Sequence, residues 1–282
     1  MSDRTRTSKR KGKKKPVRSR RTAATSDRNE LYELSVQGPD AEVEFIDKTW
    51  KQLRKRHARS IREDFCGTAI ASVEWVKHRR DNTAICVDID QDVLDWAESR
   101  LSDRLDPDQI HRLTLRQGDV RTARTKPVDC VVAMNFSYYI FKTREGLMQY
   151  FKRARGGLVS DGMLVLDAYG GSDSFVEMEE RRKVDGFTYV WDQHSYNPIT
   201  GDVVNYIHYE FPDGSRINKA FAYEWRLWTL PELQELLYEA GFSKVTVYWE
   251  GTDKDGEGND EFTATTVGEA CPGWIAYLVA EK

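Results

Sequence analysis

Four short strand-like runs of this sequence each end in residues that could bind a ligand. The first ends in Glu63-Asp64-Phe65-Cys66-Gly67-Thr68, where a glycine among small residues lets the backbone approach a ligand closely. The second ends in Asp88-Ile89-Asp90, about 20 residues further on. A carboxylate at that distance can accept hydrogen bonds from both hydroxyls of a ribose, which is the role expected for Asp88.

The third and fourth runs end in further polar groups. The third is followed by Gly118-Asp119-Val120, where Asp119 could accept a hydrogen bond from an adenine amino group while Val120 packs on the ring. The fourth is followed by Asn135-Phe136-Ser137-Tyr138-Tyr139. Each feature alone has a simpler explanation, such as a tight turn at Gly67 or a helix N-cap at Asp88 or Asp90. Their recurrence at four strand ends favours a ligand site.

An alternation of strand-like and helix-like segments would position these groups. Seven strands are predicted at residues 60–65, 83–87, 113–116, 128–134, 162–168, 244–250 and 274–280. Amphipathic helices are predicted at residues 68–78, 91–101, 143–158 and 230–240, after a helical lead-in at residues 30–56 with a break at Gly38-Pro39. This order predicts a doubly wound, mostly parallel, seven-stranded α/β sheet whose carboxyl edge gathers the four ligand segments.

A different pattern interrupts the alternation at about residues 172–228. Three aromatic, alternating runs at residues 187–195, 202–211 and 215–227 are separated by turn signals, which predicts an inserted antiparallel β-meander. The charged clusters at residues 177–183 and 253–260 are expected to be solvated loops or helix faces.

Residues 1–28 are predicted to be a disordered basic tail on a single domain of residues 29–282. The first 21 residues carry a net charge of +10 against −13 for the remainder, and the tail has almost no apolar side chains. Such a segment could contact nucleic acid or the ribosome, or could act only as a solubilising tail.

Composition limits the location and the cofactor chemistry. The four cysteines are widely spaced and form no CxxC pair, so no disulfide and no metal site are expected. No stretch is apolar and long enough to span a membrane. A secretory signal is also missing, and a cytoplasmic protein is therefore expected.

The order of these motifs resembles the class I S-adenosylmethionine (SAM)-dependent methyltransferases, over roughly residues 31–282. Glu63 to Thr68 is similar to the acidic, glycine-containing loop of that family, although Phe65 and Ala69 stand where glycine is common. The resemblance implies a Rossmann-like fold with SAM as cofactor. It assigns cofactor binding to Glu63, Phe65, Cys66, Gly67, Thr68, Asp88, Ile89, Asp119, Val120, Asn135, Phe136 and Ser137.

The resemblance does not identify the methyl acceptor. The insertion looks like that of family members that methylate small molecules, so nitrogen or oxygen of a small molecule is the leading expectation. Tyr138, Tyr169 and His194 are the candidates for catalysis, with His194 as a possible base on the meander. The alternatives are a protein or RNA acceptor docked by the basic tail, and a SAM-binding protein without catalysis. The oligomeric state stays open.

Overall fold

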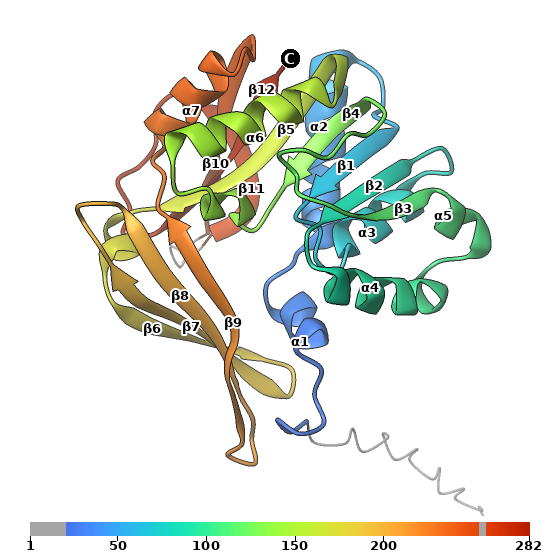
Figure 1. Cartoon of the computed structure of the whole chain (residues 1–282). Coiled ribbons are helices and arrows are strands. Elements are labelled where there is room, and N and C mark those ends of the chain that lie inside the picture. Colours follow the sequence, from blue (N-terminus) through green and yellow to red (C-terminus); the bar gives the residue numbers. More distant parts are fainter. Residues whose placement is uncertain (1–20, 254–257) are drawn as a thin grey trace, which may run out of the picture.

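The main body is an eight-stranded sheet in the order β11-β10-β12-β5-β4-β1-β2-β3 (Figure 1). The structure is a computed structural model that describes residues 21–253 and 258–282. The strands of this sheet are β1 (Ser60–Asp64), β2 (Thr83–Asp88), β3 (Leu113–Gln117), β4 (Val128–Ala133), β5 (Leu158–Gly170), β10 (Lys244–Thr252), β11 (Gly258–Thr265) and β12 (Trp274–Glu281). Strands β1 to β5 are parallel, and β12, β10 and β11 are antiparallel. The predicted doubly wound α/β fold is confirmed.

The prediction of seven strands was wrong by one. Residues 258–265 form β11, which pairs with β10 at the edge of the sheet. The sequence analysis had placed residues 258–260 in a solvated loop or helix face and had predicted no strand here. Most of its side chains are exposed, so the strand leaves no alternation of apolar residues in the sequence. The prediction for residues 254–257 lies outside the described residues.

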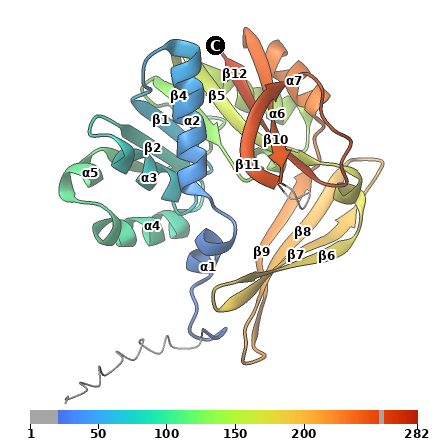
Figure 2. The ribbon, with the colours of Figure 1, turned by 180° about the vertical axis from the view of Figure 1, so that it is seen from behind.

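Two layers of helices cover the sheet. One face carries α2 (Pro39–Arg54), α3 (Ile70–His78) and α4 (Gln91–Arg104), and the other carries α6 (Arg144–Gly156) and α7 (Leu230–Glu239) (Figures 1 and 2). The first layer buries Trp50 and Trp75, and the second buries Tyr150 and Phe151. The short helix α5 (Pro107–His111) precedes β3. Among the described residues, no helix is both long and apolar enough to cross a membrane.

The insertion is a separate four-stranded antiparallel sheet. Its strands are β6 (Met178–Val184), β7 (Phe187–Tyr196), β8 (Asp202–Glu210) and β9 (Arg216–Arg226), in sequential order. The meander is therefore confirmed, with one strand more than predicted. Residues 178–184 form the edge strand β6, whose charged side chains are largely exposed, whereas the charged cluster at residues 177–183 was expected in a loop or a helix face. Two short 3-10 helices, η1 (Ser137–Ile140) and η2 (Ser172–Phe175), lie near the base of this sheet.

Helix α1 (Arg28–Ser35) lies between the insertion and the main body (Figures 1 and 2). Asp27 caps the helix by accepting hydrogen bonds from the backbone amides of Asn29 and Glu30. Residues 22–25 form a turn that contacts the insertion, where the Ala23 amide donates to Ser215. Residues 21–28, assigned to the disordered tail by the sequence analysis, are therefore ordered here. The rest of that prediction, residues 1–20, lies outside the described residues.

Candidate functional site

The loop between β1 and α3 is built from left-handed backbone. Phe65, Gly67 and Ala69 have φ angles of 58°, 50° and 58°. Glycine adopts this region without steric cost, which explains why the resembled family has glycine at the positions of Phe65 and Ala69. The buried Glu63 carboxylate accepts the amide and hydroxyl hydrogens of Ser72 in α3. These bonds fix the loop to the first turn of α3.

Asp88 at the end of β2 contacts this same loop. Its Oδ2 accepts the Gly67 amide at 2.8 Å and its Oδ1 accepts the Asp90 amide at 3.0 Å. Asp90 caps α4, as the sequence analysis expected. The adjacent Ile89 is 69% exposed, which is unusual for a large apolar side chain beside a buried strand. Asp88 and Ile89 therefore offer a polar and an apolar group at the carboxyl edge.

The segment after β3 is held by an ion pair. The Asp119 carboxylate binds the Arg121 guanidinium through both of its oxygens, with a shortest distance of 2.6 Å. These hydrogen bonds lower the pKa of Asp119 below its usual range. The neighbouring Val120 is 4% exposed. Asp119 is thus ionised at neutral pH and keeps lone pairs for a further donor.

The segment after β4 turns sharply at Asn135 and Phe136. Both residues are left-handed, with φ of 59° and 56°. Their amides donate to the two oxygens of Asp167 at 2.6 and 2.9 Å. Burial raises the pKa of Asp167 to about 7, and these two amides oppose the rise. Asp167, near the end of β5, therefore positions the turn rather than contacting a ligand.

The remaining residues assigned to the cofactor are close to these groups. Thr68 donates its hydroxyl to Gln37 at 3.2 Å, Cys66 is buried under the loop, and Ser137 donates to the Met134 carbonyl at 2.8 Å. All of the assigned residues lie at the carboxyl ends of β1 to β4 or shortly after them. The strand order reverses between β1 and β4, which is where an open α/β sheet binds its ligands.

A cavity of about 310 Å³ opens beside this edge. It touches the carboxyl edge at Asn135 and Phe136, and its far wall is the inner face of the inserted sheet. Aromatic rings supply most of the lining: Tyr32, Phe136, Tyr169, Tyr189, Trp191, Tyr223, Trp225 and Trp274. Two carboxylates, of Asp173 and Glu180, also line it. The cavity can therefore hold a small molecule with an apolar body and a cationic group.

The three residues predicted to be catalytic occupy different environments. Tyr169 lines the cavity, and burial raises its pKa to about 12, so its hydroxyl is protonated at neutral pH. Tyr138 is fully buried and donates to the Asp167 carbonyl at 2.7 Å. His194 is exposed on the opposite face of β7 from Trp191, and its ring contacts Tyr206. The structure thus brings only Tyr169 to the cavity.

Sequence reasoning missed several lining residues. Tyr32 comes from α1, and no motif links this helix to the site. Glu180 lies opposite Trp191 in the β6–β7 ladder, on a strand that the sequence analysis did not predict. For His194, strand alternation was the available signal, because residues 191 and 194 of one strand point to opposite faces.

The outer face of the inserted sheet brings Glu179, Asp192 and His208 together. One ligand atom from each lies within 4.8 Å of the others. The Lys219 amide donates to His208 Nδ1 at 3.1 Å, so the ring hydrogen is on Nε2, which donates to Asp192 at 3.2 Å. A metal ion at Nε2 would displace this hydrogen and leave the Lys219 amide facing an N–H. The geometry favours a structural hydrogen-bonded pair over a metal site.

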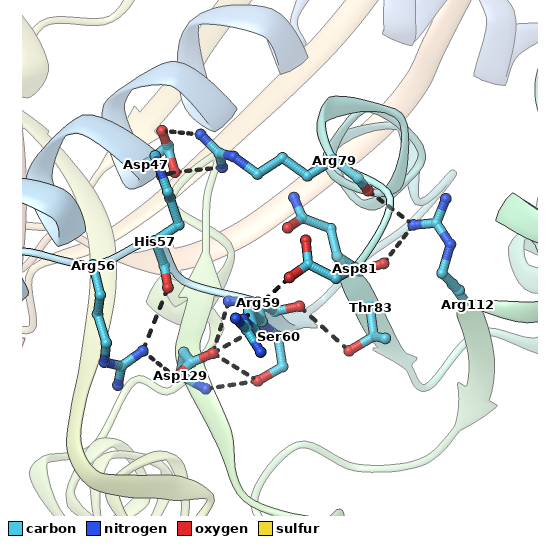
Figure 3. Close-up of polar contacts among 11 residues, drawn as sticks. Asp47, Arg56, His57, Arg59, Ser60, Arg79, Asp81, Thr83, Arg112 and Asp129 are labelled. Atoms are coloured by element: carbon cyan, nitrogen blue, oxygen red, sulfur yellow. Dashed lines mark hydrogen bonds and ion pairs between the residues drawn. The ribbon is translucent and has the colours of Figure 1, made fainter.

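An arginine-rich cavity of about 550 Å³ lies at the opposite, amino-terminal edge of the sheet. Figure 3 shows its polar network. Arg79 binds both oxygens of Asp47 at 2.6 Å, Arg59 pairs with Asp81, and Arg56 pairs with Asp129. Because these guanidinium groups already have carboxylate partners, the network holds the strand ends together and does not present an anion site.

No protein-family profile matches this sequence, and no curated protein matches it. Solved structures do match. One is a SAM-dependent methyltransferase from Clostridium acetobutylicum, with a TM-score of 0.64 and 16% identity over 88% of this chain and 96% of that chain. A second is the sugar N-methyltransferase KedS8 from Streptoalloteichus, with a TM-score of 0.62 and 18% identity over 97% of this chain and 98% of that chain. A third is the SAM-bound amino pentose methyltransferase CalS10 from Micromonospora echinaspora, with a TM-score of 0.63 and 15% identity over 89% of this chain and 94% of that chain.

The chain has the Rossmann-like fold of these methyltransferases. The similarity spans the main body and the insertion, since 97% of this chain is covered by KedS8. At 15–18% identity the similarity concerns the fold. The function must therefore be argued from the site itself.

Proposed function

We propose that this protein transfers the methyl group of SAM to a nitrogen atom of a small-molecule amine. The observation that carries the proposal is the aromatic cavity that meets the carboxyl edge at Asn135 and Phe136. An acceptor in this cavity would lie beside the cofactor residues at the strand ends. The structural neighbours KedS8, a sugar N-methyltransferase, and CalS10, an amino pentose methyltransferase, agree with this choice.

The carboxyl edge fits SAM by its chemistry. Asp88 would accept hydrogen bonds from ribose hydroxyls, and the exposed Ile89 would cover one face of the adenine ring. The backbone at Gly67 is open, since a Cβ placed there would meet no atom within 4 Å. SAM, when bound, supplies a methyl group on a sulfonium, which is transferred by in-line displacement to a lone pair.

The cavity would bind and orient the amine. Trp191 and Tyr189 offer ring faces that attract a cation, and Glu180 and Asp173 offer negative charge. Tyr169 would donate a hydrogen bond to the bound acceptor, because its pKa of about 12 keeps its hydroxyl protonated. The ammonium must lose a proton before its lone pair can react, and Glu180, which is exposed at the cavity wall, would accept it and pass it to solvent. Tyr138 and His194 have no role in this proposal.

The test is turnover with a panel of small amines, including methyl glycosides of amino sugars, followed as formation of S-adenosylhomocysteine and of the methylated amine. We expect turnover by the wild type and a loss of about 10- to 100-fold in kcat/KM for Glu180→Gln. Glu179→Gln is the matched control, because this neighbour on β6 points to the opposite face and should leave turnover unchanged. Methylation of hydroxyl compounds with no amine turned over would contradict the proposal.

A further inference from the structure

A second, larger cavity of about 960 Å³ adjoins the aromatic cavity. The two share Tyr169, Gly170, Ser174 and Trp274 in their linings, so the two cavities meet at these residues. We call the larger cavity the distal groove. It lies between α7, strand β10 and residues 264–270, which include the end of β11 and the segment after it. An acceptor that fills the aromatic cavity can therefore extend directly into the distal groove.

The floor of the distal groove is a tryptophan platform. Trp249 on β10 and Trp274 on β12 have ring centroids 5.1 Å apart and ring planes at 37°. The two residues are diagonal neighbours on one face of the ladder, since Trp249 pairs with Ala276. Such paired indole rings offer a broad apolar surface on which a flat ring can stack.

Two glycines allow these rings to lie against the backbone. A Cβ on Gly170 would come within 2.2 Å of the Trp274 ring, and a Cβ on Gly268 within 2.9 Å of the Trp249 ring. Gly170 faces Trp274 directly in the β5–β12 ladder. The platform therefore depends on glycine at both positions.

The charges around the distal groove favour an uncharged occupant. Of the described residues that line it, only Lys244 and Glu269 are charged, and the Lys244 ammonium is 3.4 Å from Glu281. A phosphate or a polyanion would meet no cluster of cations here. The remaining lining is apolar or uncharged, with Val245 and Val247 beside Trp249 and with Thr246, Thr265 and Gln234 as hydrogen-bonding groups.

We propose that the distal groove binds an uncharged, flat ring system at the far end of the acceptor, while the amine of the same molecule occupies the aromatic cavity. This inference rests on the proposed function, and it adds that the acceptor is an extended molecule rather than a free amino sugar. Exposed apolar residues at the rim, Phe175 at 48% and Val267 at 79%, would be covered by such a ligand.

The first experiment needs neither cofactor nor amine. Prodan, an uncharged naphthalene fluorophore, is titrated into the full-length protein, and binding is followed by its emission shift. We expect saturable binding, with a Kd that Trp249→Ala raises at least tenfold. Trp249→Phe should raise the Kd less, because it keeps a ring. Trp191→Ala, in the aromatic cavity, should change the Kd less than twofold. Loss of prodan binding in Trp191→Ala but not in Trp249→Ala would overturn the proposal. The absence of saturable prodan binding to the wild type would also overturn it.

The second experiment separates this proposal from the proposed function. The methyl and naphthyl glycosides of one amino sugar are compared as acceptors. We expect kcat/KM to be at least tenfold higher for the naphthyl glycoside than for the methyl glycoside. Trp249→Ala should remove this preference by lowering kcat/KM for the naphthyl glycoside to the value for the methyl glycoside. Equal kcat/KM values for the two glycosides would overturn the proposed role of the distal groove and leave the proposed methyltransferase activity intact. Prodan binding that depends on Trp249, with neither glycoside methylated, would support the groove and contradict the amine acceptor.

Discussion

Several residues at the carboxyl edge have a left-handed backbone conformation that is unfavourable for residues with a side chain. Phe65, Ala69, Asn135 and Phe136 all have φ between 56° and 59°. Each costs on the order of 1 kcal/mol relative to glycine. The surrounding contacts offset this cost, through the Asp88 bond to Gly67 and the Asp167 bonds to the β4 turn. The strained residues flank the point where the cofactor and the acceptor would meet.

Buried carboxylates are the second feature at this scale. Burial raises the pKa of Glu42 to about 7, that of Glu63 to about 8 and that of Asp167 to about 7. An acid with a raised pKa holds a proton in the folded state that the unfolded state releases. Its stabilising contribution is therefore greatest at low pH and is lost as the pH rises from about 4.5 to about 7.

Glu42→Gln tests this linkage. Glutamine cannot ionise, so the variant should gain stability relative to the wild type between pH 5 and pH 8, by roughly 2 kcal/mol. Urea unfolding at both pH values measures the difference, and the exposed Glu44→Gln on the same helix serves as the control. An equal difference between variant and wild type at the two pH values would refute the raised pKa.

At the scale of elements, α1 connects the insertion to the main body. On one side Asp27 accepts the indole hydrogen of Trp96 in α4 at 2.9 Å, and Glu33 binds Arg104 through two bonds of 2.8 Å. On the other side Tyr32 packs on Phe221 of β9 with centroids 4.8 Å apart. Because Tyr32 also lines the aromatic cavity, the position of α1 helps to determine the shape of that cavity.

Asp27→Ala should loosen this helix. The substitution removes the N-cap and the bond to Trp96, which together contribute about 1–2 kcal/mol to local stability. Amide hydrogens of residues 30–35 should exchange about tenfold faster, as measured by mass spectrometry, while those of α6 stay unchanged. Asp106→Ala removes the cap of α5 and should leave α1 unaffected. Unchanged exchange in Asp27→Ala would show that α1 is held by other contacts.

Elements also show where sequence reasoning succeeds and fails. The buried strands β2, β4 and β5 were predictable because each contains a run of apolar residues. The strands that were missed, β6 and β11, lie at the edges of the two sheets and expose most of their side chains. Their backbone pairing with a neighbour leaves no apolar signal in the sequence.

At the scale of the whole molecule, the residues proposed to bind the cofactor were easier to group from the sequence than those that line the aromatic cavity. The former lie in short segments at the ends of parallel strands, and the order of strands places them at one edge. The aromatic cavity instead combines α1, η2, the inserted sheet and β12, which are far apart in the sequence. Only the packing of the insertion on the main body brings Tyr32, Glu180 and Trp274 together.

The central claim, that the carboxyl edge binds SAM, is tested most directly by calorimetric titration of the wild type, Asp88→Ala and Asp90→Ala. We predict micromolar binding to the wild type, at least tenfold weaker binding to Asp88→Ala, which corresponds to about 1.4 kcal/mol, and wild-type affinity for Asp90→Ala, which removes only the cap of α4. No binding to the folded wild type, or equal binding to all three proteins, would contradict this account.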